Sequence, residues 1–287
     1  MKKTTALRNL LAKEGIIVAP GATTALFAYL VELAGFDVVY ATGAGIANMN
    51  LGVPDIGLAT MTENLEVVKR MNDATRLPVF ADIDNGYGNS VMVYRTVKEF
   101  TACGIAGLQL EDQRLPKRCG HFEGKAVISK EEMVSKIKAA KDAMLDPDTV
   151  LMARTDAISV NGFEDAVDRA NAYREAGADL LFVEAPTSRE MLREIPRRVP
   201  GLHTANMVEG GKTPPMRNSE MEALGFKFVL YANAPLKAAV KGVKDLLEHL
   251  KTRDGTGDAA QLMIPMTERN RITNFDFYRE LETRFKA

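Results

Sequence analysis

The stretch VLMARTDAISVNGFEDAVDRANAYREAGADLLFVE, residues 150–184, contains one complete strand–helix–strand unit. Residues 150–155 form a short run with the composition of a buried strand. Residues 162–176 have apolar positions at three- and four-residue spacing with charges on the other face, which predicts an amphipathic helix. Gly177 is placed to end that helix before a second strand at 180–184. The stretch therefore predicts two parallel strands joined by a helix.

The same unit recurs along the chain. Eight strands are expected, at 16–19, 37–41, 78–82, 107–111, 150–155, 180–184, 203–207 and 226–231. Further amphipathic helices are expected at 62–75 and 129–144. Because strands and helices alternate strictly, and eight units fill most of the chain, the sequence predicts an α/β fold of the closed (β/α)8 type, a TIM barrel.

The expected domain organisation is a single barrel domain over residues 1–287, since no linker or low-complexity segment interrupts the pattern. The part from about 238 to 287 exceeds what eight units require. Its sequence predicts a helix, a polar loop at 252–260 and a helical run at 274–285. These extra C-terminal helices are expected to serve packing or oligomerisation.

Composition indicates a globular protein that acts on small molecules. The 287 residues are 46% hydrophobic and 26% charged, enough to bury a large core. Lys and Arg number 37 against 38 Asp and Glu, so no basic surface is expected to attract nucleic acid or anionic lipid. No apolar run reaches the roughly 18 residues of a membrane span, so a cytoplasmic location is expected. The two cysteines, Cys103 and Cys119, form no disulfide or metal-binding pattern.

Polar residues follow the predicted strands at the end where barrel enzymes hold their active sites. In strand order they are Thr42, Gly43 and Ala44, then Asp82 and Asp84, Glu111 and Asp112, Arg154, Glu184 and Asn206. The backbone N–H groups of the small-residue turn at 42–45 can hold a carboxylate. Acids at this density predict a divalent cation, and a set of oxygen ligands favours Mg²⁺ or Mn²⁺ over Zn²⁺.

The loop after the fourth strand places Cys119 among Lys117, Arg118 and His121. Neighbouring positive charges favour the thiolate and bring the thiol pKa, ordinarily about 8.5, towards neutrality. A thiol of that kind can transfer a proton near pH 7. Cys119 is therefore a candidate proton donor.

Each of these residues also has a purely structural interpretation. Asp82 and Asp84 could cap the following helix, and Arg154 could only neutralise the acids around it. An Arg at the mouth of a barrel is equally a natural partner for a substrate carboxylate or an oxyanion. His121 could merely orient its loop, and Cys119 could be an ordinary loop residue. The residues alone leave these alternatives open.

The chain resembles the isocitrate lyase/phosphoenolpyruvate mutase superfamily in five motifs: DIDNGYG (82–88), EDQ (111–113), PKRCGH (116–121), ARTDA (153–157) and ANM (205–207). The resemblance covers about residues 7–250. The KRCGH run is similar to the carbon–carbon lyase branch, which includes 2,3-dimethylmalate lyase, 2-methylisocitrate lyase and petal death protein. Carboxyvinyl-carboxyphosphonate phosphorylmutase is similar as well.

The resemblance implies a role for each matching residue. Mg²⁺, or Mn²⁺ as an alternative, and its waters would be surrounded by Asp55, Asp82, Asp84 and Glu111. Substrate would be held by Thr42, Gly43, Ala44, Gly120, Arg154, Glu184 and Asn206. Catalysis would involve Cys119 as proton donor, together with Tyr40, Arg154 and His121, and Tyr40 or a metal-bound water would be the base. The resemblance also implies a homotetramer, a dimer of dimers that exchange the last barrel helix.

The expected function is that of a Mg²⁺-dependent lyase. It would cleave the C2–C3 bond of a 2-hydroxy dicarboxylate, such as 2,3-dimethylmalate, 2-methylisocitrate or a related substituted malate. The products would be a 2-oxo acid such as pyruvate and a second carboxylate, with Cys119 protonating the enolate. Departures from the family pattern at 208–214 and 231–236 leave the substituents on the substrate open.

Three alternatives remain. One is hydrolysis or decarboxylation of oxaloacetate in the same pocket. Another is a phosphonopyruvate-type phosphonomutase or hydrolase, which has little need of a proton-donating thiol. The third is a non-catalytic metabolite-binding barrel, which would tolerate loss of Cys119.

Overall fold

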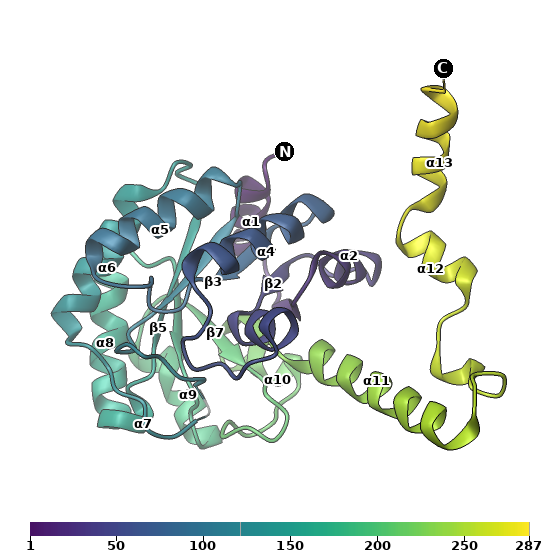
Figure 1. The fold of residues 1–287 in the computed structure, drawn as a ribbon. Helices are drawn as coiled ribbons and strands as arrows, with labels where there is room; N and C mark the ends of the chain where they lie inside the picture. The colour runs from purple at the N-terminus through teal and green to yellow at the C-terminus, as the bar shows by residue number, and fades with distance from the viewer. Residues whose placement is uncertain (121, 287) are drawn as a thin grey trace. The chain divides into compact units, whose positions relative to one another are not determined.

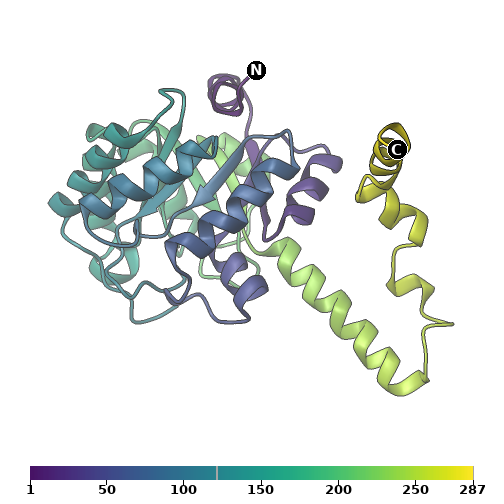
Figure 2. The ribbon, with the colours of Figure 1, turned by 45° about the horizontal axis from the view of Figure 1, so that its top comes forward.

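The computed structural model describes residues 1–120 and 122–286. The chain divides into two compact units, Met1–Pro235 and Leu236–Ala287. In the first unit, eight parallel strands close into a barrel in the order β1-β2-β3-β4-β5-β6-β7-β8. Helices surround the barrel, as Figures 1 and 2 show. The predicted (β/α)8 fold is confirmed.

The strands lie where the apolar runs predict them. They are β1 (Ile17–Ala22), β2 (Val39–Ala41), β3 (Val79–Asp82), β4 (Gly107–Glu111), β5 (Val150–Thr155), β6 (Leu180–Val183), β7 (Leu202–Asn206) and β8 (Phe226–Tyr231). All residues of β3 to β6 are buried, because helices cover the outside of the barrel and side chains fill its inside. Only β1 departs clearly from the expectation: the Pro20-Gly21 pair looks like a turn, yet Pro20 pairs with Tyr231 and Gly21 with Tyr40.

Ten helices belong to the described part of the first unit. They are α1 (Lys3–Ala12), α2 (Ala25–Leu33), α3 (Gly43–Ile46), α4 (Met61–Ala74), α5 (Ser90–Ala102), α6 (Lys130–Ala143), α7 (Ile158–Asn161), α8 (Phe163–Glu175), α9 (Arg189–Arg198) and α10 (Asn218–Ala223), with a π-helical turn η1 (Ala47–Leu51). Side-chain caps fix where they start: Thr60 and Glu63 form a capping box on α4, and Ser129 caps α6. The predicted helices α4, α6 and α8 are confirmed.

An apolar cluster inside the barrel supports the end of the strands where the polar residues gather. Phe80 and Phe228 meet across the interior with their ring centroids 5.4 Å apart. Tyr40 and Phe182 belong to the same buried cluster. A second cluster fills the layer between strands and helices. Close-packed interiors deform little, so the strand ends are rigid anchors for functional side chains.

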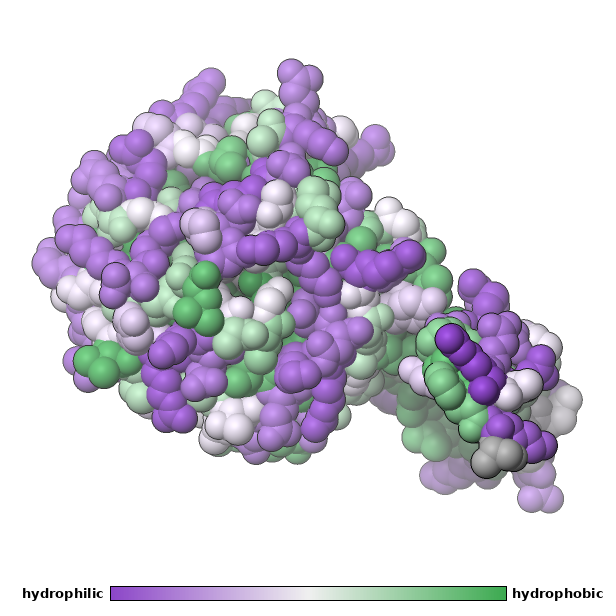
Figure 3. Space-filling view, turned by 90° about the horizontal axis from the view of Figure 1, so that it is seen from above, coloured by the Kyte–Doolittle hydropathy of each residue, from purple (hydrophilic) through white to green (hydrophobic). Residues whose placement is uncertain are grey.

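The second unit is helical. It contains α11 (Ala234–Arg253) from Leu236 onwards, a 3₁₀ turn η2 (Ala260–Leu262), α12 (Met266–Ile272) and α13 (Phe275–Arg284). The predicted helical run at 274–285 is confirmed as α13, whereas α12 was not predicted. Figure 3 shows hydrophobic side chains among hydrophilic ones on the surface of this unit. The described helices include none with the length and apolar character that a membrane span needs.

Candidate active site

Side chains from the carboxyl ends of the strands and from the loops that follow them surround one cavity of about 30 Å³. Its lining includes these predicted site residues: Tyr40, Thr42, Ala44, Asp55, Asp82, Cys119, Gly120, Arg154, Glu184 and Asn206. Strand register explains why residues distant in sequence meet here, since Asp82 pairs with Gln109 and Glu111 pairs with Arg154. Gly43, Asp84 and Glu111 lie directly beside the cavity: a Cβ on Gly43 would be 3.1 Å from Asp82 Oδ2 and 3.2 Å from Asp84 Oδ1. His121 lies outside the described residues.

A lysine lies within the acid set, the name used here for Asp55, Asp82, Asp84 and Glu111. Lys117 Nζ is 2.5 Å from Asp55 Oδ1 and 2.6 Å from Asp84 Oδ1, and its side chain is buried. Burial by itself would lower the pKa of Lys117, but Asp84, Glu111 and Asp55 together raise it well above its ordinary value. Lys117 is therefore a charged partner of the acids. The sequence placed Lys117 only as a neighbour of the Cys119 thiol, so this second role was missed.

Two carboxyl groups in this set hold their protons unusually tightly. Burial raises the pKa of Asp84 to about 6, although Lys117 opposes the shift. Burial likewise raises the pKa of Glu111 well above its ordinary value, and Arg154 opposes that shift. Asp84 also has a φ of 48°, in the left-handed region that only a few per cent of non-glycine residues adopt. Buried acids of this kind, on constrained backbone, are typical of functional sites.

The predicted metal ligands surround the cavity without forming one metal-binding cluster. Across residues 1–120 and 122–286, no three His, Cys, Asp or Glu side chains are gathered into a group that could hold a metal ion. The Lys117 ammonium group contacts both Asp55 and Asp84. The donor chemistry nevertheless fits a hard cation: Glu111 Oε1 is buried and has no hydrogen-bond partner among the described atoms, and all the candidate ligands are carboxylate oxygens.

The Tyr40 hydroxyl is within hydrogen-bond distance of one acid, Asp82, and of the amide oxygen of Gln109. Its hydroxyl lies 3.3 Å from Asp82 Oδ2 and 3.1 Å from Gln109 Oε1. Burial raises the pKa of Tyr40 well above 10, and the neighbouring Asp82 raises it further. A phenol with a raised pKa stays protonated near neutral pH, so it has no free basic form with which to take a proton. The geometry therefore favours Tyr40 as a residue that positions Asp82 over the predicted role in proton abstraction.

Arg154 is held by three carboxylates. Its Nε lies 2.9 Å from Asp156 Oδ2 and 3.6 Å from Glu111 Oε2, and its Nη1 lies 3.2 Å from Glu184 Oε2. Its guanidinium also stacks over Phe182, 5.2 Å from the ring centroid. Burial alone would lower the pKa of Arg154, but Asp156, Glu184 and Glu111 raise it well above its ordinary value. Arg154 thus keeps its positive charge at the cavity, and a guanidinium group of this kind is suited to bind a carboxylate.

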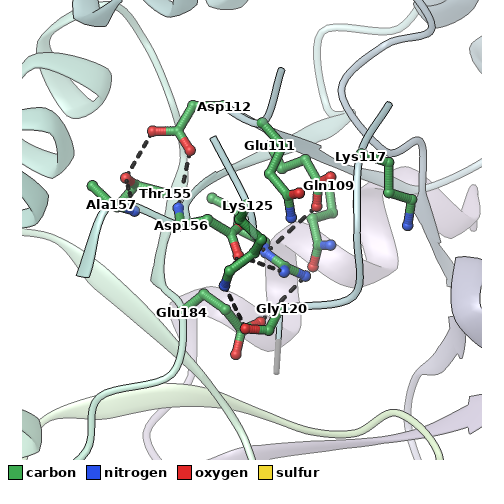
Figure 4. A network of polar contacts seen from close by, with 12 residues as sticks. Gln109, Glu111, Asp112, Lys117, Gly120, Lys125, Thr155, Asp156, Ala157 and Glu184 are labelled. Carbon is green, nitrogen blue, oxygen red and sulfur yellow. Dashed lines mark hydrogen bonds and ion pairs between the residues drawn. The ribbon is translucent and has the colours of Figure 1, made fainter. Parts of the chain in front are cut away.

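Asp112 and Asp156 form the support behind Arg154 (Figure 4). Asp112 Oδ1 accepts the backbone N–H of Asp156 at 2.9 Å, and Asp112 Oδ2 accepts the hydroxyls of Thr155 and Tyr173, each at 2.7 Å. Although burial would raise it, the pKa of Asp156 is held at about 2 by Arg154 and Lys125. The sequence analysis gave Asp112 at a strand end and Asp156 only within the ARTDA motif, without a role, because its partner Lys125 is distant in the chain.

The Cys119 loop, defined here as residues 115–120 and 122–125, contributes Lys117, Arg118, Cys119 and Gly120 to the lining of the cavity. The Cys119 N–H donates to the Asp55 carbonyl at 3.0 Å. Gly120 packs so closely that a Cβ there would lie 2.4 Å from Arg154 Nη2 and 2.7 Å from Glu184 Cδ, so a larger residue would have to displace these two side chains. A cavity of about 30 Å³ has room for only one or two waters. The loop must therefore move to admit a dicarboxylate.

Two carboxamide side chains, those of Asn206 and Asn233, also line the cavity. The side-chain oxygens of Asn206, at the end of β7, and Asn233, just after β8, are buried and have no hydrogen-bond partner among the described atoms. A buried polar atom without a partner costs about 1–3 kcal/mol, which a bound polar ligand would recover. Asn206 was predicted and Asn233 was not. The only signal for Asn233 was the departure from the family pattern at 231–236.

Comparisons with known proteins give matches over nearly the whole chain. Residues 7–251 match the family model described as phosphoenolpyruvate phosphomutase. The chain is 45% identical to 2,3-dimethylmalate lyase of Eubacterium barkeri, over 96% of each chain. A crystal structure of 2,3-dimethylmalate lyase, titled as a PEP mutase/isocitrate lyase superfamily member, matches with a TM-score of 0.93 and 34% identity, covering 100% of this chain and 96% of that one. Phosphonopyruvate hydrolase in complex with oxalate and Mg²⁺ matches with a TM-score of 0.90 and 28% identity, covering 100% of both chains.

Proposed function

Because the chain belongs to the phosphoenolpyruvate mutase/isocitrate lyase superfamily, we propose that it is a carbon–carbon lyase that cleaves the C2–C3 bond of a 2-hydroxy dicarboxylate. The observation that carries the proposal is the 45% identity to a 2,3-dimethylmalate lyase over 96% of both chains. The position of Cys119 at the cavity supports it, since a lyase needs an acid for its carbanion. 2,3-Dimethylmalate is therefore the first candidate substrate.

Cleavage of 2,3-dimethylmalate requires one proton to leave and one to arrive. The 2-hydroxyl gives its proton to a water molecule bound at the site, the C2–C3 bond breaks, and C2 becomes the carbonyl of pyruvate. The electron pair stays on C3, giving the enolate of propionate. Cys119 gives its thiol proton to C3, and propionate forms. Arg154 holds a substrate carboxylate, and the Cys119 loop excludes water while the carbanion exists.

We propose Mg²⁺ as the cofactor, held by Asp82, Asp84 and Glu111 with Asp55 near by. When bound, the metal supplies a Lewis acid that lowers the pKa of the substrate hydroxyl and stabilises the forming carbonyl. Lys117 balances the charge of Asp55 and Asp84. Tyr40 keeps Asp82 in position through its hydroxyl.

A substrate panel tests the proposed function. Purified protein with Mg²⁺ should release a 2-oxo acid from 2,3-dimethylmalate, and excess EDTA should abolish the release until Mg²⁺ is restored. 2-Methylisocitrate, oxaloacetate and phosphonopyruvate complete the panel. Oxalate from oxaloacetate, or phosphate from phosphonopyruvate, as the fastest product would assign one of the alternative functions. No turnover of any of the four would favour a metabolite-binding barrel.

We also propose that the chain assembles as a homotetramer, a dimer of dimers that exchange the last barrel helix. The support is an exposed apolar stripe on α11, formed by Val240, Val243, Leu247 and Leu250 at helical spacing. Within α11 only Leu236 is buried, so most of its apolar surface lacks a partner in the described chain. Native mass spectrometry should give four times the mass of one chain, 31.4 kDa, and Val243→Glu should shift the mass to smaller species. A wild-type monomer would refute the assembly.

We propose a cytoplasmic location, where a reducing environment keeps the Cys119 thiol intact. Cell fractionation followed by immunodetection would test this.

A further inference from the structure

We propose that Lys125 is a positioning residue that latches the Cys119 loop closed and, through Asp156, aligns the Arg154 guanidinium. Lys125 belongs neither to the acid set nor to the residues of the proton transfer proposed above. For its kinetic part it rests on the proposed function. Its structural part can be tested without any substrate.

The first observation is where the Lys125 ammonium lies. Lys125 Nζ donates to Asp156 Oδ1 at 2.8 Å and also to the carbonyl oxygen of Gly120, the residue after Cys119 (Figure 4). The side chains of Lys125 and Asp156 are only 1% and 0% exposed. A buried ammonium group is tolerated only with such partners, because leaving water without them costs several kcal/mol. These contacts therefore tie the loop to the barrel wall.

The second observation is that Asp156 belongs to the rigid part of the molecule. Its backbone N–H is held by Asp112, which Thr155 and Tyr173 hold in turn through their hydroxyls. Lys125, in contrast, belongs to the segment that must move before a dicarboxylate can enter. The ion pair consequently joins a fixed carboxylate to a moving ammonium group. It can form fully only when the loop is closed.

The third observation is that Lys125 and Arg154 share one carboxylate. Asp156 Oδ1 accepts from Lys125 Nζ at 2.8 Å and from Arg154 Nη2 at 3.1 Å. When the loop opens and Lys125 withdraws, Asp156 keeps Arg154 as its only described cationic partner and attracts it more strongly. Closure lets Lys125 take part of that charge, so Arg154 can turn towards Glu184 and the cavity. The latch thereby couples loop closure to the position of the substrate-binding cation.

The loop carries a second ion pair that serves as an internal control. Glu123 Oε1 contacts Lys212 Nζ, but the Glu123 side chain is 85% exposed. Exposed pairs contribute little to stability because water screens them. Breaking this pair should leave loop closure nearly unchanged.

Alkylation of Cys119 by a maleimide, in protein without substrate or metal, tests the latch. A Cys103→Ser background leaves Cys119 as the only thiol. In that background, Lys125→Met should raise the alkylation rate at least about tenfold, since opening no longer breaks a buried ion pair. Lys125→Arg should stay close to the parent protein, and so should the matched control Glu123→Gln. Adding Lys125→Met to Asp156→Asn should change the rate little further, because the partner is already neutral.

Two outcomes would overturn the latch: an unchanged rate in Lys125→Met, or an equal increase in Glu123→Gln. A wild-type circular dichroism spectrum and a single cooperative unfolding transition in Lys125→Met exclude general loss of structure as the cause. In a separate assay with 2,3-dimethylmalate, Lys125→Met should lower kcat/KM at least about tenfold, and Lys125→Arg should restore most of it. If alkylation responds as expected but no variant turns over substrate, the latch stands and the proposed function fails.

Discussion

Replacing Cys119 by alanine is expected to lower lyase turnover by about 10²–10⁴-fold, the range that a positioned general acid contributes. The reason is that the enolate formed at C3 would have to take its proton from water, which the closed Cys119 loop excludes. Binding of oxalate in the presence of Mg²⁺, measured by calorimetry, should be preserved, because Arg154 and the acid set remain. The Cys119→Ala variant would thus lose turnover and keep oxalate binding.

The control for that experiment is Cys103→Ala. Cys103 follows α5, away from the lining of the cavity, and it should tolerate alanine with full activity. Equal turnover in Cys119→Ala and wild type would remove the thiol from the mechanism. Loss of oxalate binding together with turnover would mean that Cys119 serves to shape the site and that the proton comes from elsewhere.

Replacing Arg154 by methionine is expected to have the largest effect on stability, and it should also abolish turnover. The change leaves Asp156, Glu184 and Glu111 buried without the guanidinium that pairs with all three. Breaking a buried ion pair from one side costs about 3–5 kcal/mol. The free energy of unfolding in urea should fall by that order, and Arg154→Lys should recover only part of it because one ammonium group cannot replace the two-point contact with Asp156.

Arg198→Met is the matched control, since Arg198 also pairs with a carboxylate, Glu164, but on the exposed surface. Its urea midpoint and its turnover should stay close to wild type. If Arg154→Met unfolded at the wild-type urea concentration, the three carboxylates would have to be protonated or differently paired, and the proposed electrostatics of the site would be wrong.

The fold could be predicted from the sequence because its signals are local. The strands of a (β/α)8 barrel are buried on both faces, so each is an apolar run, and each intervening helix shows its own periodicity. The units that fit this rule, such as Val150–Thr155 followed by Phe163–Glu175, were placed to within one residue. Pro20-Gly21 broke the rule, because a turn-like pair continues β1 through contacts with distant strands.

Only those site residues that lie at strand ends or in recognisable motifs could be predicted from the sequence. Asp82, Glu111, Arg154 and Glu184 follow or end strands, and parallel pairing brings such residues to one face. What the sequence did not show were contacts that long side chains of one loop make with the loops after other strands. Lys117 entering the acid set is one case.

Lys125 reaching Asp156 is another such contact. Loop conformation decides these pairs, and no spacing rule encodes it. The same limit applies to Tyr40, because the sequence does not show that its hydroxyl is buried beside Asp82 and Gln109.

The central claim, cleavage with protonation by Cys119, is tested most directly by product analysis in D₂O. With Mg²⁺ and 2,3-dimethylmalate, the wild-type protein should release pyruvate and propionate in equal amounts. The propionate should carry one deuterium at C2, the former C3, since the Cys119 thiol exchanges with solvent before it protonates the enolate. Cys119→Ala should form both products at least about 10²-fold more slowly. Failure to cleave 2,3-dimethylmalate and the other substituted malates, or equal rates in the two proteins, would contradict the account.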